Sequence, residues 1–389
     1  MSSTLDISQV AASLIPSDIR SVAEMGMQMD DVVALWFGES AWPSPEIAVE
    51  AAQAALGSND HFYQPNSGKP QLREAIAHYY QKIYQLDVSV PQISVTGSGM
   101  QGVMLTAQAI VNPGDSVVVL QPSWPNLGEA FRLMGAAVVP FSLIEKERQW
   151  YLPLDELLAQ LTHHTRAVVV NSPNNPTGWT MDANEQQILL DHCRDRGIWI
   201  ISDDVYSRLY PHSDFAPTFL SLTEPEDKLI SINSFSKAFS MTGWRLGWIV
   251  APASLEPTYA MLNEFNIAGP AAFIQTAGAR VLQHGESAVS VLKHRLAHAL
   301  ELTQSFLAET PGVTMIQPTG AFYAMLRIHE MENSVDTAKD LLLQNRVGMA
   351  PGAAFGQSAD AYLRMCYAQP DHVLIEALNR FKSYLQNKS

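Results

Sequence analysis

Cysteine, basic residues and long apolar runs are scarce in this chain. Of its 389 residues only two, Cys193 and Cys366, are cysteines. Two cysteines exclude a disulfide framework and a cysteine-rich zinc site, and they are typical of a reducing compartment. The eleven histidines include no HExxH motif, and the adjacent pair His163 and His164 would point to different faces of a strand or helix. We therefore expect no metal site in this protein.

Acidic residues outnumber basic ones, 39 against 24, so the formal net charge is −15. This excess of negative charge argues against a nucleic-acid or anionic-membrane partner, although a local basic pocket for a small anion stays open. No stretch approaches 18 consecutive apolar residues, and the N-terminus lacks the basic start and long apolar run of a targeting segment. These absences predict a protein that works in the cytoplasm.

The composition is that of a globular protein, with 47% hydrophobic and 16% charged residues, and the length suits two or three domains. Short apolar runs rich in β-branched residues alternate with helical patterns at 72–84, 101–110 and 182–196. The runs have the length and composition of strands buried on both faces. This alternation predicts an α/β fold with an open, mainly parallel sheet of seven strands between helices. The expected strands are 93–96, 116–120, 136–140, 167–171, 198–202, 229–232 and 246–250, and the last one follows its predecessor closely enough to be the odd strand.

The pattern changes near residue 280. A long helical pattern at 288–310 leads to apolar runs and helices that predict a smaller α+β domain. The first 45 residues precede the alternating region, and we assign them to the smaller domain. The sequence therefore predicts a large domain of residues 46–280 and a small domain of residues 1–45 together with 281–389.

The segment SINSFSKAFSMTGWRLGW, residues 231–248, contains the most informative chemistry. Lys237 follows Ser234 and Ser236 at the end of an expected strand, and Arg245 stands eight positions later. A lysine that is desolvated at a strand end has a lowered pKa and a nucleophilic amine. The serines and the arginine are suited to a phosphate group. On these residues alone, a solvated loop lysine with an incidental arginine is the slightly favoured alternative.

Six segments together resemble a known family. The pattern SxSKxxxxTGWRxG resembles the lysine motif of the class I (fold-type I) aminotransferases, which use pyridoxal 5′-phosphate. Five further segments resemble that family in the same order along the chain: GKPQLREA (68–75), PSWPN (122–126), NSPNNPTG (171–178), SDDVY (202–206) and LRMCY (363–367). The resemblance spans roughly residues 30–370. It implies an aspartate-aminotransferase-like fold, the same cofactor and transfer of an amino group.

The resemblance also implies which residues act on the cofactor. Lys237 would form a Schiff base with pyridoxal phosphate and then move a proton between the substrate Cα and the cofactor. Asp203 would pair with the protonated pyridine nitrogen, which makes the ring an electron sink. An opposite charge about 4 Å away, at an effective dielectric of about 20, gives roughly 4 kcal/mol of gross attraction. Periodicity does not choose between Asp203 and Asp204, whereas the family spacing to Tyr206 favours Asp203.

Further cofactor contacts follow from the same resemblance. Tyr206 and Asn175 would donate hydrogen bonds to the phenolic oxygen of the cofactor, and Trp124 would stack on its ring. A glycine-rich helix start favours a bound phosphate because its backbone N–H groups are free. The implied phosphate contacts are Ser98, Gly99, Met100, Ser234, Ser236 and Arg245, together with Tyr63, which relatives typically lend across a dimer interface.

Substrate contacts are implied at two matched positions. Arg364 would bind the α-carboxylate as a bidentate fork, with Asn175 also in contact. Gly38 resembles the glycine whose backbone meets this carboxylate, although the chain has Ser40 where the family usually has proline, which weakens the argument for that turn. In this reading the partners are small molecules, an amino acid and a 2-oxo acid.

Substrate preference is less constrained. A second carboxylate on the substrate needs its own cation, but the chain has Met100 where some relatives have lysine. Other relatives use an arginine of the partner subunit, and the segment NEFNIAGP at 263–270 has no basic residue. The sequence therefore does not support a strict preference for aspartate. Neutral or aromatic amino acids are equally expected, with Trp36, Phe37 and Met100 as candidate wall residues.

The leading interpretation is a transaminase that moves an amino group from an L-amino acid to a 2-oxo acid by a ping-pong mechanism. A C–S β-lyase or other eliminase of the same fold would use the same Lys237 and Asp203, while the TGWR motif favours transfer. A catalytically silent, cofactor-binding regulatory protein is a third alternative, against which the presence of both residues argues. The resemblance further implies a homodimer with shared active sites, because Tyr63 would come from the other subunit.

Overall fold

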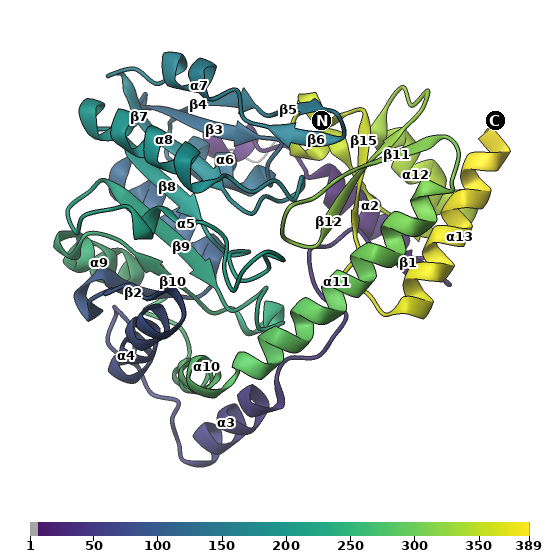
Figure 1. The fold of residues 1–389 in the computed structure, drawn as a ribbon. Coiled ribbons are helices and arrows are strands. Elements are labelled where there is room, and N and C mark those ends of the chain that lie inside the picture. Colours follow the sequence, from purple (N-terminus) through teal and green to yellow (C-terminus); the bar gives the residue numbers. More distant parts are fainter. Residues whose placement is uncertain (1–6, 389) are drawn as a thin grey trace.

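The computed structural model describes residues 7–388, and its largest element is a seven-stranded sheet (Figure 1). The strand order is β2-β10-β9-β8-β7-β3-β4. Strands β9, β8, β7, β3 and β4 pair in parallel, and β10 runs antiparallel to both of its neighbours. The predicted mainly parallel sheet is confirmed, and β10 is its odd strand. The bounds are β2 Ile93–Thr96, β3 Ser116–Gln121, β4 Ala137–Ser142, β7 Thr165–Asn171, β8 Trp199–Asp203, β9 Leu229–Ser234 and β10 Gly247–Val250.

Helices cover both faces of this sheet. They are α3 (Glu46–Gly57), α4 (Pro70–Tyr79), α5 (Gly99–Ile110), α6 (Pro125–Leu133), α7 (Leu154–Gln160), α8 (Ala183–Arg196), α9 (Glu256–Asn266) and α10 (Ala272–His284). Val117 and Val119 of β3 pack in one cluster with α5, α6 and α9, whereas Val118 and Leu120 pack in another with α7 and α8. Successive side chains of a strand point to opposite faces, so burial on both faces requires the continuous apolar runs seen in the sequence.

The C-terminal third forms a second, antiparallel sheet in the order β11-β12-β15-β14. Its strands are β11 (Val313–Ile316), β12 (Tyr323–Ile328), β15 (Tyr362–Cys366) and β14 (Ala350–Pro351), with α12 (Ser334–Asn345) and α13 (Asp371–Lys388) nearby. The N-terminal region joins this part: α2 (Asp18–Gly26) packs on α12, and β1 (Val33–Ala34) pairs with β13 (Val347–Gly348). These pairings support the proposed assignment of residues 1–45 to a small domain.

A long helix, α11 (Glu286–Ala308), runs from beside α10 to the second sheet, where it packs on β11 and α13 (Figure 1). The remaining short elements are α1 (Gln9–Ala12), β5 (Ile144–Lys146) and β6 (Gln149–Tyr151), besides short 3₁₀ segments. Among the described helices none is long and apolar enough to cross a membrane. The first six residues of the N-terminal segment used in the targeting argument lie outside the described part of the chain.

One helix prediction differs in detail from the structure. The helix expected over 72–84 ends as an α-helix at Tyr79 and continues as a π-helical turn, Tyr80–Tyr84. The apolar pattern of the sequence gives no sign of the wider π-helical turn, because Tyr80 and Tyr84 are both buried and their rings pack in the same aromatic cluster. The helical pattern at 182–196 matches α8, and Asp182 caps this helix: Asp182 Oδ1 accepts a hydrogen bond from the Glu185 amide at 2.8 Å.

The carboxyl ends of three adjacent parallel strands create the setting for a site. Asn171, Asp203 and Ser234 are the last residues of β7, β8 and β9, so their side chains meet at one edge of the sheet. Beside them, the start of α5 packs closely on β10. A Cβ atom on Gly247 would lie 2.7 Å from the Gly99 backbone nitrogen, so only glycine permits this approach.

Candidate active site

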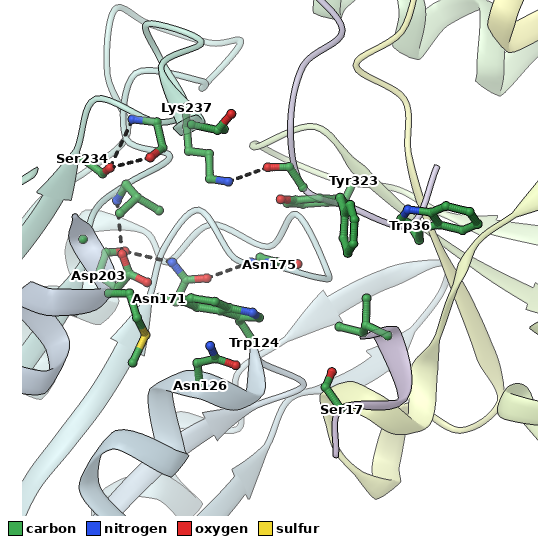
Figure 2. Close-up of a pocket in the computed structure, with 18 of the residues that line it drawn as sticks. Ser17, Trp36, Trp124, Asn126, Asn171, Asn175, Asp203, Ser234, Lys237 and Tyr323 are labelled. Carbon is green, nitrogen blue, oxygen red and sulfur yellow. Dashed lines mark hydrogen bonds between the residues drawn. The ribbon is translucent and has the colours of Figure 1, made fainter. Parts of the chain in front are cut away.

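A cavity of about 630 Å³ opens between this edge of the central sheet and the second sheet (Figure 2). All of the predicted site residues line it except Ser98 and Tyr63. Ser98 lies next to the cavity as the N-cap of α5, and Tyr63 is a 90% exposed loop residue elsewhere on the surface. The predicted lining residues are Gly38, Gly99, Met100, Trp124, Asn175, Asp203, Tyr206, Ser234, Ser236, Lys237, Arg245 and Arg364.

Lys237 points into the cavity from the turn after β9. Its Nζ donates a hydrogen bond to the Gly38 carbonyl at 2.5 Å, which ties the central sheet to the N-terminal region. Burial lowers the pKa of the Lys237 amine to about 8, and the nearby Arg364 charge acts in the same direction. A lysine with this pKa carries a large neutral fraction near physiological pH and is a competent nucleophile.

Two adjacent carboxyl groups at the end of β8 have different surroundings. Asp204 accepts hydrogen bonds from the Ser202 hydroxyl at 2.6 Å and the Ser231 hydroxyl at 2.5 Å, and it does not line the cavity. Asp203 does line the cavity, and within residues 7–388 the only hydrogen bond to its carboxyl group is a long one from the Val205 amide, 3.4 Å. Burial raises the pKa of Asp203 to about 7. A buried carboxyl group without a cation suits a positively charged ring nitrogen in the cavity.

The start of α5 and the turn after β9 form a cradle for an anion. The Ser98 side chain caps α5 by accepting a hydrogen bond from the Gln101 amide at 3.0 Å, so the first turn of the helix faces the cavity. Ser234 and Ser236 present hydroxyls 2.9 Å apart. Within residues 7–388 no carboxylate forms an ion pair with Arg245, and burial lowers the pKa of its guanidinium. A helix start, two hydroxyls and an unpaired arginine fit the phosphate of pyridoxal phosphate.

Arg364 is 2% exposed and links the two sides of the cavity. One terminal nitrogen donates to Asn175 Oδ1 at 2.9 Å, and the other donates to the Trp36 carbonyl. Its Nε atom has no hydrogen-bond partner among the described residues. Burying an arginine in this way is costly unless a ligand completes its bonding, so the geometry suits a carboxylate in the cavity.

Three hydrogen bonds, two of Asn171 and one of Tyr323, were not expected from the sequence. Asn171 accepts a hydrogen bond from the Asn175 amide at 2.8 Å and donates to the Asp203 carbonyl at 3.0 Å, so it fixes the Asn175 loop against β8. The Tyr323 hydroxyl lies 2.6 Å from the Tyr206 hydroxyl. Asn171 begins the NSPNNPTG segment and could have been found there. Tyr323 opens an ordinary apolar strand, β12, and has no sequence signal of its own.

Sequence reasoning also missed the wall formed by the N-terminal region. This wall brings Arg20 of α2 to the cavity, where its guanidinium lies 5.2 Å from the Phe37 ring centroid. Figure 2 shows Ser17, from the same segment, across the cavity from Lys237. The lining residues from this region are Pro16, Ser17, Ile19, Arg20, Ser21 and Glu24, joined by Asn126 from α6.

Comparisons with known proteins agree with this geometry. The family model described as aminotransferase class I and II matches residues 33–381. An aspartate aminotransferase of Pyrococcus horikoshii is 34% identical, with 96% of this chain and 95% of that protein covered. Aromatic-amino-acid aminotransferase 2 of Thermococcus litoralis is 30% identical, with 96% of each covered. The solved structure of Thermus thermophilus aspartate aminotransferase with maleate matches with a TM-score of 0.90 at 30% identity, covering 97% of this chain and 99% of that one.

The family model spans most of the chain, and the fold matches solved aminotransferases throughout. The buried lysine, the unpaired carboxyl group opposite it and the anion cradle are the features that pyridoxal phosphate needs from a protein. The chain belongs to the class I and II aminotransferases, and it is a pyridoxal-phosphate-dependent enzyme.

Proposed function

We propose that Lys237, Asp203 and Arg364 carry out transamination between an L-amino acid and a 2-oxo acid in this cavity. The observation that carries the proposal is that a partly buried amine, a buried carboxyl group and a buried guanidinium face one cavity without pairing with one another. Each of the three groups can therefore still form an ion pair or a hydrogen bond with a ligand.

When bound, pyridoxal phosphate supplies an aldehyde carbon and an electron-accepting pyridinium ring. Lys237 would hold it through Nζ, and Ser234, Ser236 and Arg245 would hold its phosphate. Asp203, close to half-protonated near pH 7 on its own, would become a carboxylate opposite the pyridine nitrogen and keep that nitrogen protonated. Trp124 would cover one face of the ring.

On the substrate side, Arg364 would hold the α-carboxylate and so orient the Cα–H bond toward Lys237. The neutral Lys237 amine would then accept the Cα proton and give it back. Asn175 already donates its backbone N–H to Asn171 and accepts from Arg364, which fixes its side chain between the carboxylate site and the ring. An eliminase would use the same groups, so transfer must be separated from elimination by its products.

Transfer predicts a stoichiometric half-reaction. With an amino donor and no acceptor, the enzyme should release about one equivalent of 2-oxo acid per site and then stop, and a 2-oxo acid acceptor should restore turnover. Lys237→Ala should abolish both steps because the amine is lost, whereas Lys228→Ala, at an exposed lysine that bonds the Gly197 carbonyl, should remain active. Product is followed by absorbance of the cofactor and by the 2-oxo acid released. Continued release of 2-oxo acid without an acceptor would identify an eliminase instead.

The lowered Lys237 pKa predicts how the cofactor-free enzyme reacts with an aldehyde. Only the neutral amine attacks, so the rate should rise with pH to a plateau with a midpoint near pH 8, instead of near the ordinary lysine value of 10.5. Below the midpoint the rate should fall about tenfold per pH unit. The measurement is capture of pyridoxal, which lacks a titrating phosphate, followed by borohydride reduction and mass analysis of Lys237. A midpoint near 10.5 would show that the amine is solvated in solution.

We also propose that two copies of the chain form a dimer with shared sites. Tyr63 is 90% exposed and Phe62 71% exposed, in a loop that lines a surface pocket with residues 268–272. Phe265, 84% exposed, belongs to the same side of the molecule, since Glu264 accepts a hydrogen bond from Asn66 of this loop at 3.0 Å. Exposed aromatic side chains gathered in this way fit a subunit interface. They support the proposal that Tyr63 reaches the phosphate of the other subunit.

Mixing two inactive variants tests the shared site. Tyr63→Ala and Lys237→Ala, dissociated and reassociated in equal amounts, should give heterodimers with one doubly defective and one intact site, so activity should return to roughly a quarter of wild type. Each variant reassociated with itself is the control. If exchange is confirmed by mass and no activity returns although Tyr63→Ala alone is inactive, Tyr63 does not act across the interface. A fully active Tyr63→Ala enzyme would equally refute its role at the phosphate.

For the substrate side chain we propose a mixed subsite. Met100, Val103 and Phe37 offer apolar surface, and Arg20 adds a cation at the N-terminal wall. Arg20 is exposed and forms no ion pair within the described residues, so it is free to turn toward a second carboxylate. This arrangement would accept dicarboxylic and aromatic substrates in turn. The cytoplasmic location remains a prediction, which the two free cysteines support.

Arg20→Gln should separate these two substrate classes. The KM for aspartate and 2-oxoglutarate should rise roughly threefold to tenfold, the loss of one partly exposed charged hydrogen bond, while the KM for phenylalanine should stay the same. Glu24→Gln, one helical turn away on the same wall, is the matched control and should lower the dicarboxylate KM slightly, because a repelling charge is removed. An equal rise in KM for both substrate classes would show that Arg20 does not bind the substrate side chain.

A further inference from the structure

Two buried phenols meet at the contact between the two sheets. Tyr206 follows β8 of the central sheet and is 3% exposed, and Tyr323 is the first residue of β12 and is fully buried. Their hydroxyl oxygens are 2.6 Å apart. A phenol has one hydrogen to donate, so one of the two must donate to the other.

The geometry of the pair allows either hydroxyl to donate, and the nearby cations favour one direction. The Arg364 guanidinium lies 4.6 Å from the Tyr323 ring centroid, closer than Lys237 Nζ lies to the Tyr206 centroid, 5.7 Å, so positive charge favours the Tyr323 hydroxyl as the donor. Burial and the Asp203 charge raise the pKa of both phenols, so these two effects do not distinguish the donor. With Tyr323 as the donor, the Tyr206 hydrogen remains available for another acceptor.

Tyr323 is held rigidly enough to act in this way. Its backbone pairs with Cys366 of β15, and its ring makes an edge contact with Tyr206, with centroids 5.6 Å apart. On its far side the Gly38 backbone closes against the hydroxyl, so that a side chain at Gly38 would collide with the Tyr323 oxygen. Among the described residues, no other hydrogen bond is made by the Tyr206 or the Tyr323 side chain.

We propose that Tyr323 is a positioning residue that donates its hydrogen bond to the Tyr206 oxygen and thereby directs the Tyr206 hydrogen to the cofactor oxygen. The proposal rests on the proposed function of Tyr206 at the cofactor. Consecutive hydrogen bonds polarise one another, so Tyr206 donates more strongly when it also accepts. Tyr323 further connects Arg364, which would hold the substrate carboxylate, with the residue that tunes the cofactor.

The test is the pH at which the absorption spectrum of the bound cofactor changes. A hydrogen bond donated to the cofactor oxygen favours the form that has lost its proton, so weakening it should raise this pH midpoint. Tyr206→Phe should raise the midpoint most, and Tyr323→Phe should raise it by roughly 0.3–1 unit, as expected for one net hydrogen bond. Tyr323→Phe in a Tyr206→Phe background should change nothing further, since Tyr323 acts through Tyr206.

A matched control is Tyr367→Phe, a buried phenol outside the cavity that donates to the Ala321 carbonyl at 3.3 Å, and it should leave the midpoint unchanged. If Tyr206→Phe raises the midpoint and Tyr323→Phe does not, the positioning role is wrong while the proposed function of Tyr206 stands. If the Tyr323→Phe shift persists in the Tyr206→Phe background, Tyr323 acts on the cofactor directly and the inference is also wrong. An unchanged midpoint in Tyr206→Phe itself would instead remove the role proposed for Tyr206. Bound-cofactor absorbance and the melting temperature show that each variant is folded.

Discussion

The burial of unpaired charge around one cavity is the constraint on which the rest of the structure depends. Asp203 and Arg364 are buried and Lys237 is partly buried, and none of them forms an ion pair with another within the described residues. Such burial destabilises the folded chain until ligands complete the bonding. The fold must therefore draw its stability from elsewhere, and the aliphatic clusters on both faces of the seven-stranded sheet supply it.

The contact between the two sheets follows from the same constraint. Arg364 belongs to the second sheet, yet it bonds Asn175 of the central domain and the Trp36 carbonyl of the N-terminal region. Lys237 makes the reverse connection, from the central sheet to the Gly38 carbonyl. Each cationic side chain thus crosses to the other part of the chain, so the cavity exists only where the parts meet. The N-terminal region, which supplies the Trp36 and Gly38 carbonyls, pairs with β13 close to this boundary.

Much of this could be predicted from the sequence, because local patterns determine it. The apolar runs predicted the seven strands, and the short spacing before β10 indicated the antiparallel one. The motif spacing favoured Asp203 over Asp204. In the structure Asp203 faces the cavity, whereas Asp204 is hydrogen-bonded to Ser202 and Ser231 and does not line it. Tyr323 and Arg20 could not be predicted from the sequence, because their roles depend only on tertiary contacts. Tyr323 is an unremarkable strand residue until β12 meets Tyr206, and Arg20 lies in a short amphipathic helix that has no motif.

The positions of these residues separate chemistry from selectivity. The groups proposed to hold the cofactor stand at strand ends and at a helix start of the central sheet, where neighbouring backbone pairs on both sides fix them. The N-terminal wall with Arg20 is a short helix joined by exposed segments, attached through α12 and the brief β1–β13 pairing. On the proposed function, substitutions in that wall would change which side chain fits while leaving the cradle intact. Relatives of this chain are named as aspartate and as aromatic-amino-acid aminotransferases. A variable wall beside a fixed cofactor cradle is compatible with both substrate classes in one family.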